Sequence, residues 1–252
     1  MGDSFTEGLW DPYPDAPDVQ RGWADNLAAV LSARRIAAGA APLEYANLAI
    51  RGRKLRPVIA EQLEVTIDAQ PDLVSLVAGG NDILRASADI DAISNALEDA
   101  VVALRASGAD VLLATGFKAG AALSWTNGRT AILNANLWST ARRTGAHVLD
   151  LWGMRPLGDL RLWSDDRIHL TPEGHQRVAN AALVALGLEP DDDAYDTPLD
   201  ASPPAAFRES ARANAVWMRQ HVGPWVRRRL TGTSSGDGRT AKWPTPQSWP
   251  QA

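Results

Sequence analysis

The chain has 252 residues, 45% of them hydrophobic and 22% charged, with a formal net charge of −5. This composition is that of an ordinary globular protein, and the negative charge gives no electrostatic reason to expect nucleic acid as a partner. The absence of cysteine excludes disulfides and thiolate metal sites. No apolar run approaches the roughly 20 residues that span a bilayer, and no signal-peptide pattern is present, so the sequence predicts a cytoplasmic protein without a membrane span.

The first predicted element is a tight turn at residues 2–8, with a glycine at each end and Ser4 near its start. Glycine tolerates the backbone dihedrals of a sharp turn, and small neighbours leave the serine hydroxyl open to a substrate. Asp, Ser and Gly also populate ordinary surface turns, so the serine alone admits that simpler interpretation. A loop rich in Pro and Asp follows over 10–18.

Helical and strand patterns then alternate along the chain. Helical spacing of apolar residues predicts helices over 22–38, 55–67, 90–104, 129–143 and 172–186. Short apolar runs predict strands over 45–50, 73–78, 111–114 and 147–151. Apolar strands separated by helices indicate an α/β fold with a parallel sheet covered on both faces, whose ligands bind beyond the carboxyl ends of the strands.

The C-terminal part has a different composition. An acidic, Pro-containing stretch over 189–204 is typical of a linker. A further helix is expected over 205–230, and a flexible tail rich in Gly, Ser, Pro and Thr over 231–252. The sequence therefore predicts one catalytic domain over 1–188, and no pattern in it predicts an oligomeric state.

Three residues have the side chains of a hydrolase triad. Ser4 is a candidate nucleophile, His169 a candidate base and Asp166 the acid that orients the base. The spacing of Asp166 and His169 lets one loop present both side chains together. Asp165 is the rival acid, but the three-residue spacing favours Asp166.

An acyl-transfer reaction also needs donors for the negative charge that develops on the carbonyl oxygen. The backbone N–H groups of Ser4 and Gly52 and the side-chain amide of Asn81 are the candidates for this oxyanion hole. Asn81 in an ordinary turn is the alternative interpretation.

Other polar residues have weaker claims. We interpret His175 as a packing histidine rather than a second base, and Trp10 as a candidate lining residue of the acyl pocket. The acidic run at 191–193 lacks the spacing of a calcium loop, so the sequence predicts neither a metal site nor a cofactor.

Four blocks of the chain, at 2–5, 47–52, 79–82 and 166–169, resemble those of the SGNH (GDSL-type) hydrolase family, in order. The resemblance implies a three-layer α/β/α, flavodoxin-like fold and a serine esterase or lipase that cleaves small-molecule carboxylic esters through an acyl-enzyme. The alternatives are a deacetylase of a sugar or another acetylated metabolite, and a catalytically impaired binding or scaffold protein of the same fold.

In that family a buried central strand precedes the serine turn, whereas only Met1 precedes Gly2 here. A central parallel strand supplies two ladders of hydrogen bonds and part of the core. We therefore expect the sheet to lack its first central strand, and we expect the natural protein to have upstream residues.

Overall fold

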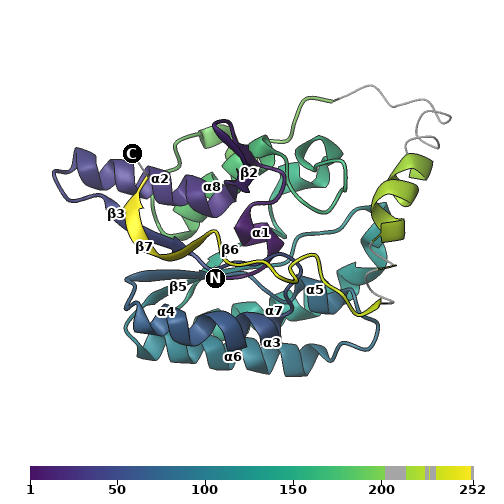
Figure 1. Cartoon of the computed structure of the whole chain (residues 1–252), viewed down its shortest axis with the longest axis horizontal. Helices are drawn as coiled ribbons and strands as arrows, with labels where there is room; N and C mark the ends of the chain where they lie inside the picture. The colour runs from purple at the N-terminus through teal and green to yellow at the C-terminus, as the bar shows by residue number, and fades with distance from the viewer. Residues whose placement is uncertain (202–213, 225–226, 228–230, 251–252) are drawn as a thin grey trace.

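A parallel sheet of three strands lies at the centre of the computed structural model, which describes residues 1–201, 214–224, 227 and 231–250. The strands are β4 (Leu73–Leu76), β5 (Asp110–Ala114) and β6 (His147–Leu149), in the order β4-β5-β6. Helices cover both faces of the sheet (Figure 1). This arrangement confirms the expected three-layer α/β/α fold.

The two helical layers differ in make-up. One contains α2 (Gly22–Ala37) and α8 (Pro172–Ala185), which pack against each other. The opposite layer is formed by α3 (Leu55–Val58), a π-helical turn (Ile59–Leu63), α4 (Glu64–Asp68), α6 (Ile90–Ala106) and α7 (Asn127–Thr144). Each of these helices lies where apolar periodicity predicts one.

Short helical elements connect the layers. Two are α-helical turns, α1 (Ser4–Glu7) and α5 (Gly80–Ile83). The others are 3-10 turns at Ala121–Thr126, Arg155–Gly158, Leu160–Leu162 and Asp193–Asp196, and a π-helical turn at Met218–Val222. Among the described residues, no helix is both long and apolar enough to cross a membrane.

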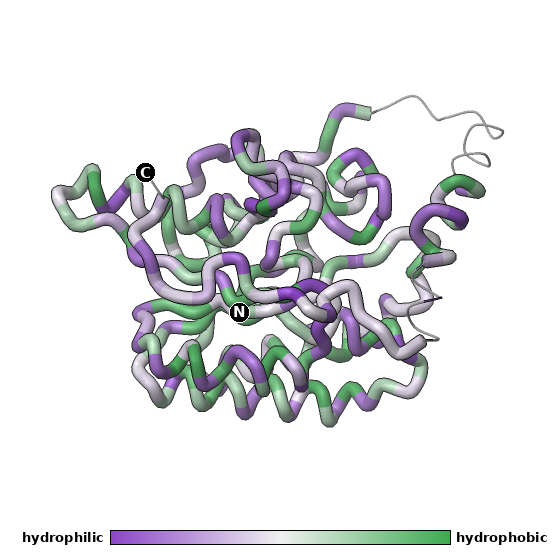
Figure 2. The backbone as a smooth tube through the Cα atoms, in the orientation of Figure 1, coloured by the Kyte–Doolittle hydropathy of each residue, from purple (hydrophilic) through white to green (hydrophobic). Residues whose placement is uncertain are grey.

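Strand β5 divides the core into two parts because its side chains alternate between the two faces of the sheet. Val111 and Leu113 belong to the cluster beneath α6 and α7, whereas Leu112 and Ala114 belong to the cluster beneath α2 and α8. The α6 and α7 helices show the matching alternation of polar and apolar residues in Figure 2. These four side chains are buried, which explains why the strand is a continuous apolar run after the exposed Asp110.

The first two residues lie beside the carboxyl end of β4. Gly2 forms a parallel bridge with Val77, and the amino group of Met1 donates to the carbonyl of Ser75 at 2.8 Å. On the other side, the N–H of Ile50 donates to the carbonyl of Gly2 at 3.3 Å. These bonds fix the start of the serine turn at the edge of the sheet where ligands of parallel sheets bind.

Strand β3 (Leu43–Asn47) pairs with an element that the sequence does not predict. In place of a flexible tail over 231–252, residues Trp243–Trp249 form strand β7, antiparallel to β3 (Figure 1). The Gly, Ser, Pro and Thr content suggests a loop, but Trp249 is only 4% exposed and its ring lies 4.9 Å from that of Tyr45. Proline is compatible with β7 because the strand is at a sheet edge.

Two further differences concern the loops. A hairpin of β1 (Pro12–Tyr13) and β2 (Ala16–Gln20) replaces the loop expected over 10–18. Much of the helix expected over 205–230 lies outside the described residues, although 214–224 are helical. The expected linker over 189–204 is described only as far as residue 201.

We expect Trp249→Ala to lower the free energy of unfolding by about 3 kcal/mol, since it removes a buried aromatic side chain. The indole also donates to the carbonyl of Asp25 at 3.3 Å. Chemical denaturation would measure the change, with Trp138→Ala as the control because Trp138 is 45% exposed on α7. Equal losses in the two variants would contradict a stabilising role for β7.

Candidate active site

The serine turn is a helix of only four residues, α1, and its ends are capped. The carboxylate of Asp3 accepts the N–H of Phe5 at 3.1 Å, which satisfies one free donor at the start of the helix. Gly8 ends the helix in the left-handed conformation, with φ of 89°. A side chain at Gly8 would collide with Gly22 at the start of α2, because its Cβ would lie 2.5 Å from the Gly22 Cα.

The structure brings the three predicted triad residues together. The Nε2 atom of His169 lies 2.8 Å from the Oγ atom of Ser4. On the other side of the ring, Nδ1 lies 2.6 Å from Oδ2 of Asp166. With Nδ1 protonated, Nε2 is free to take the serine proton, which is the arrangement that activates a serine hydroxyl.

Asp166 is held as a carboxylate by the donors around it. Its Oδ1 atom accepts the N–H groups of Ile168 and His169 at 2.9 and 3.0 Å and the hydroxyl of Ser164 at 2.8 Å. Burial raises the pKa of Asp166, but these bonds and the His169 side chain outweigh burial and hold the pKa well below its usual range. The rival acid, Asp165, is exposed.

The prediction that Trp10 lines the acyl pocket is wrong. Trp10 does not line the cavity beside Ser4; its indole N–H donates to Oδ2 of Asp166 at 2.8 Å. A second indole, that of Trp217, donates to the backbone carbonyl of Asp166 at 2.9 Å. Both residues lie far from Asp166 in the sequence, so no local spacing predicts these contacts.

His175 is a buried packing residue, as the sequence analysis expects. Its Nδ1 atom accepts the N–H of Trp23 at 3.2 Å, and Nε2 lies 3.1 Å from the carbonyl oxygen of Leu9. An Nδ1 acceptor requires the neutral ring, and burial lowers the pKa of His175 to about 4. The ring therefore ties the end of the serine turn to α2 and α8.

The three candidate oxyanion donors lie around the same turn. Within the described part of the chain, the backbone N–H groups of Ser4 and Gly52 donate no hydrogen bond. Gly52 has φ of 74°, in the left-handed region that favours glycine, and a Cβ there would lie 2.4 Å from the Oγ of Ser234, which would have to move. The Asn81 amide nitrogen is 3.1 Å from Oδ2 of Asp3 and 2.9 Å from the Arg53 carbonyl.

An ion pair joins the serine helix to the loop of Gly52. The carboxylate of Glu7 accepts the backbone N–H of Arg51 at 2.6 Å and the Nε–H of its guanidinium at 2.8 Å. Both side chains are largely buried, so the pair is screened little by solvent. Because Glu7 lies one helical turn from Ser4, this ion pair fixes the distance between two candidate oxyanion donors.

Lys242, next to β7, supports the same helix from the C-terminal part of the chain. Its buried ammonium donates to the carbonyls of Glu7, Gln20 and Arg21 at 2.7–2.8 Å and forms an ion pair with Asp25 at 2.9 Å. A cation is favourable at the C-terminal end of a helix, where carbonyl groups are free. Burial lowers the pKa of Lys242, and the facing carboxylate of Asp25 opposes that effect.

The buried carboxylate of Asp25 completes this support. It accepts hydrogen bonds from four side chains at 2.8–3.2 Å, those of Tyr13, Tyr45, Asn47 and Trp243. The amide of Asn47 also donates to the carbonyl of Thr6 at 2.9 Å, within the serine helix.

Among the described residues, no group of three or more His, Cys, Asp or Glu side chains could hold a metal ion.

Comparisons with known proteins identify the family and the fold. The model of the GDSL-like lipase/acylhydrolase family matches residues 1–177. Axe2, an acetylxylan esterase from Geobacillus stearothermophilus, shares 22% identity with a TM-score of 0.62, covering 75% of this chain and 92% of its own. An alpha/beta hydrolase enzyme from the metagenome of Lake Arreo, Spain, also shares 22% identity, with a TM-score of 0.60 and coverage of 74% and 92%. A search of curated proteins gave no match.

The buried Asp3 carboxyl predicts a specific pH dependence of stability. Burial raises its pKa from 3.8 to about 6, so the folded state keeps this proton at pH values where the unfolded state has lost it. The contribution of Asp3 to the free energy of unfolding therefore falls as the pH rises from about 4 to about 6, by up to about 3 kcal/mol.

We expect Asp3→Asn to remove this decline, so that the free energy of unfolding of the variant does not fall between pH 4 and pH 6. Urea denaturation between pH 4 and pH 7 would measure it. Asp15→Asn is the control, because Asp15 is exposed in the β1–β2 hairpin. An Asp3→Asn curve as steep as that of the unaltered protein would contradict the assignment.

Proposed function

This chain belongs to the GDSL-like lipase/acylhydrolase family, and from that premise we propose that it is a serine esterase that cleaves carboxylic esters. The observation that carries the proposal is the hydrogen-bonded chain from Ser4 through His169 to Asp166, with atom separations of 2.8 and 2.6 Å. Such a chain is the arrangement that nucleophilic acyl transfer by serine requires.

In the first half of the proposed reaction, Ser4 Oγ attacks the ester carbonyl carbon and His169 Nε2 takes the hydroxyl proton. The carbon–oxygen bond to the alcohol then breaks. His169 gives its proton to the departing alcohol oxygen, which leaves an acyl group on Ser4. Asp166 stabilises the imidazolium that forms between these two proton transfers.

In the second half, His169 takes a proton from water, and the resulting hydroxide attacks the acyl-enzyme carbonyl. The bond to Ser4 Oγ breaks, His169 returns the proton to Oγ, and the carboxylic acid leaves. At the end of the cycle Ser4 and His169 have returned to their starting protonation states, and the proposed reaction uses no oxidant or cofactor.

Both tetrahedral intermediates carry a negative oxygen, and we assign its stabilisation to Ser4 N–H, Gly52 N–H and the amide of Asn81. The assignment of the two backbone N–H groups is supported because neither donates a hydrogen bond within the described part of the chain. Asn81 would exchange its hydrogen bond to Asp3 for one to the oxyanion. One such donor is worth about 3 kcal/mol in the transition state.

A second candidate function is removal of acetyl groups from a sugar or another acetylated metabolite. It is favoured by the likeness of the fold to Axe2, which is described as an acetylxylan esterase. The chemistry at Ser4 would be the same, and only the substrate would differ. Rates on acetylated xylo-oligosaccharides and on simple esters distinguish the two.

We expect a fluorophosphonate probe to label the unaltered protein and to fail on Ser4→Ala and His169→Ala, because the probe needs an activated serine. Ser139→Ala is the control, since Ser139 is exposed on α7 and should label normally. Mass spectrometry of the labelled peptide would locate the adduct. Labelling that survives in Ser4→Ala would refute the nucleophile. A folded protein without labelling or ester turnover would favour a binding or scaffold role.

We expect Glu7→Gln to lower kcat for ester hydrolysis about tenfold or more with little change in KM, because the Gly52 loop loses the carboxylate that holds it. The control is Glu61→Gln, whose carboxylate pairs with Arg53 at 2.9 Å and is 42% exposed. Steady-state kinetics on a short ester would compare the two variants. A purely structural role for Glu7 would lower the melting temperature and leave kcat unchanged.

A further inference from the structure

The cavity beside Ser4 and His169 indicates which kind of ester the enzyme prefers. This inference rests on the proposed function. The cavity has a volume of about 140 Å³, and Ser4, Asn81 and His169 lie at its mouth. From there it extends between the sheet and α7 to Leu137 and Leu151, which are only 3% and 2% exposed. The cavity therefore begins at the reacting atoms and reaches side chains that are buried in the core.

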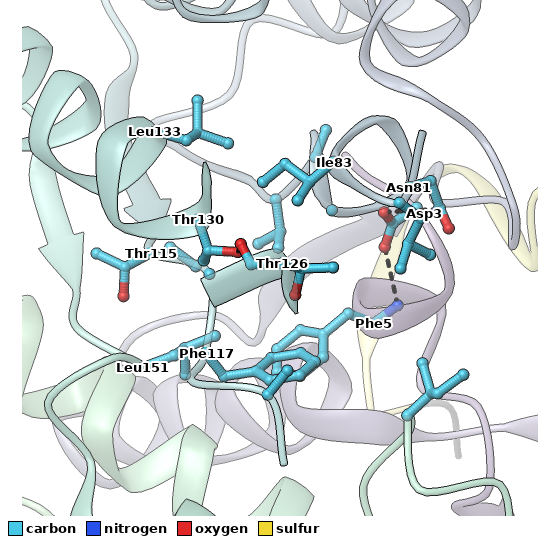
Figure 3. Close-up of a pocket in the computed structure, with 18 of the residues that line it drawn as sticks. Asp3, Phe5, Asn81, Ile83, Thr115, Phe117, Thr126, Thr130, Leu133 and Leu151 are labelled. Carbon is cyan, nitrogen blue, oxygen red and sulfur yellow. Dashed lines mark hydrogen bonds between the residues drawn. The ribbon is translucent and has the colours of Figure 1, made fainter. Parts of the chain in front are cut away.

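The walls of this cavity are mostly hydrocarbon. The side chains of Phe117, Ile83 and Leu133 surround it (Figure 3), and Phe5 closes one side with its ring 6.2 Å from that of Phe117. Away from the mouth, no lining residue carries a charge. A purely apolar ligand group would thus lose contact with water and gain contact with hydrocarbon.

The polar side chains of the wall have partners within the protein. Thr126 and Thr130 donate to the carbonyls of Leu123 and Thr126 at 2.7 and 3.1 Å, and Thr115 donates to Asp150 at 3.2 Å. The amide of Asn134 donates to and accepts from the backbone of Gly116 at 3.0 and 2.8 Å. Sugar hydroxyls buried here would find these donors engaged, and unsatisfied buried hydroxyls are costly.

We infer that this cavity binds the acyl chain of the substrate and that the enzyme acts on esters of medium-chain fatty acids. An apolar cavity of about 150 Å³ holds a benzene ring, so this one, at about 140 Å³, has room for about six carbon atoms beyond the ester carbonyl. An acetyl group would leave most of it empty, and an empty apolar cavity contributes no binding energy.

We assign the acyl chain, rather than the alcohol, to this cavity. It stays bound to Ser4 through both halves of the reaction, whereas the alcohol must leave and water must take its place near His169. Because Leu137 and Leu151 in the cavity wall are buried, an alcohol bound beside them would leave less readily than one bound on the exposed side of Ser4. The alcohol therefore lies on the open side of Ser4.

The first experiment measures kcat/KM on p-nitrophenyl esters from acetate to laurate. Burial of a methylene group is worth about a factor of four. We expect kcat/KM to rise from acetate to a maximum at hexanoate or octanoate and to fall at laurate. An active enzyme, labelled at Ser4, that prefers acetate would overturn the inference and leave the proposed function intact. No turnover and no labelling would instead defeat the proposed function.

The second experiment compares two isomers, ethyl octanoate and octyl acetate. They have equal size and hydrophobicity and differ only in which side of the ester carries the long chain. We expect kcat/KM for ethyl octanoate to be larger by about tenfold or more, the effect of a few buried methylene groups. Equal values, or a preference for octyl acetate, would overturn the assignment of the cavity to the acyl chain.

Variants at Leu133 test the wall directly. Leu133→Phe fills the cavity and should lower the ratio of octanoate to acetate kcat/KM about tenfold, and Leu133→Ala enlarges it and should move the maximum toward laurate. The adjacent Ile132→Phe is the control, because Ile132 is 54% exposed on the same helix. If Leu133→Phe fails to fold, Leu133→Ala alone decides, and an unchanged chain-length profile in it would overturn the inference.

Discussion

The whole site depends on one constraint, which is that a four-residue helix cannot hold its own position. Such a helix has almost no internal hydrogen bonds, so its free N–H and C=O groups must find partners elsewhere. Here the partners come from four directions: Asp3 caps the start, Arg51 binds the Glu7 carboxylate, Asn47 binds the Thr6 carbonyl, and Lys242 binds the Glu7 carbonyl. The supporting residues come from the helix's own N-cap, from the 47–52 segment and from the C-terminal part of the chain, so the position of Ser4 depends on segments far apart in the sequence.

The support is electrostatic as well as steric. Asp25 and Lys242 form a buried ion pair, and a buried pair is acceptable only when the remaining donors and acceptors are satisfied. The tyrosine, asparagine and tryptophan donors around Asp25 and the three carbonyls around Lys242 meet that condition. The cluster joins β3, α2, the β1–β2 hairpin and the serine helix. Replacing one member would leave a charge without its partner, which costs more than the pair itself contributes.

The sequence predicts the parts of the fold and site that local patterns determine. Asp166 and His169 lie in one loop three residues apart, and the β5 run is apolar because both of its faces are buried. The contacts of Trp10 with Asp166 and of Lys242 with Glu7 cannot be predicted in this way, because they join residues 156 and 235 positions apart. Strand β7 is not predicted from the sequence for a related reason. Its prolines indicate a loop, whereas tertiary contacts stabilise it as a strand, namely the pairing with β3 and the packing of Trp249 on Tyr45.

The contact between Lys242 and the serine helix has a consequence for the synthesis of the protein. A ribosome makes Ser4 well before it makes Lys242, because it adds roughly 5–20 residues per second. During that interval the carboxylate of Asp25 has no cation to face, and the carbonyl groups at the end of the helix remain open to water. Closing a loop of this length is entropically slow relative to local folding. The serine helix thus gains the support of Lys242 only after the segments between them have been made.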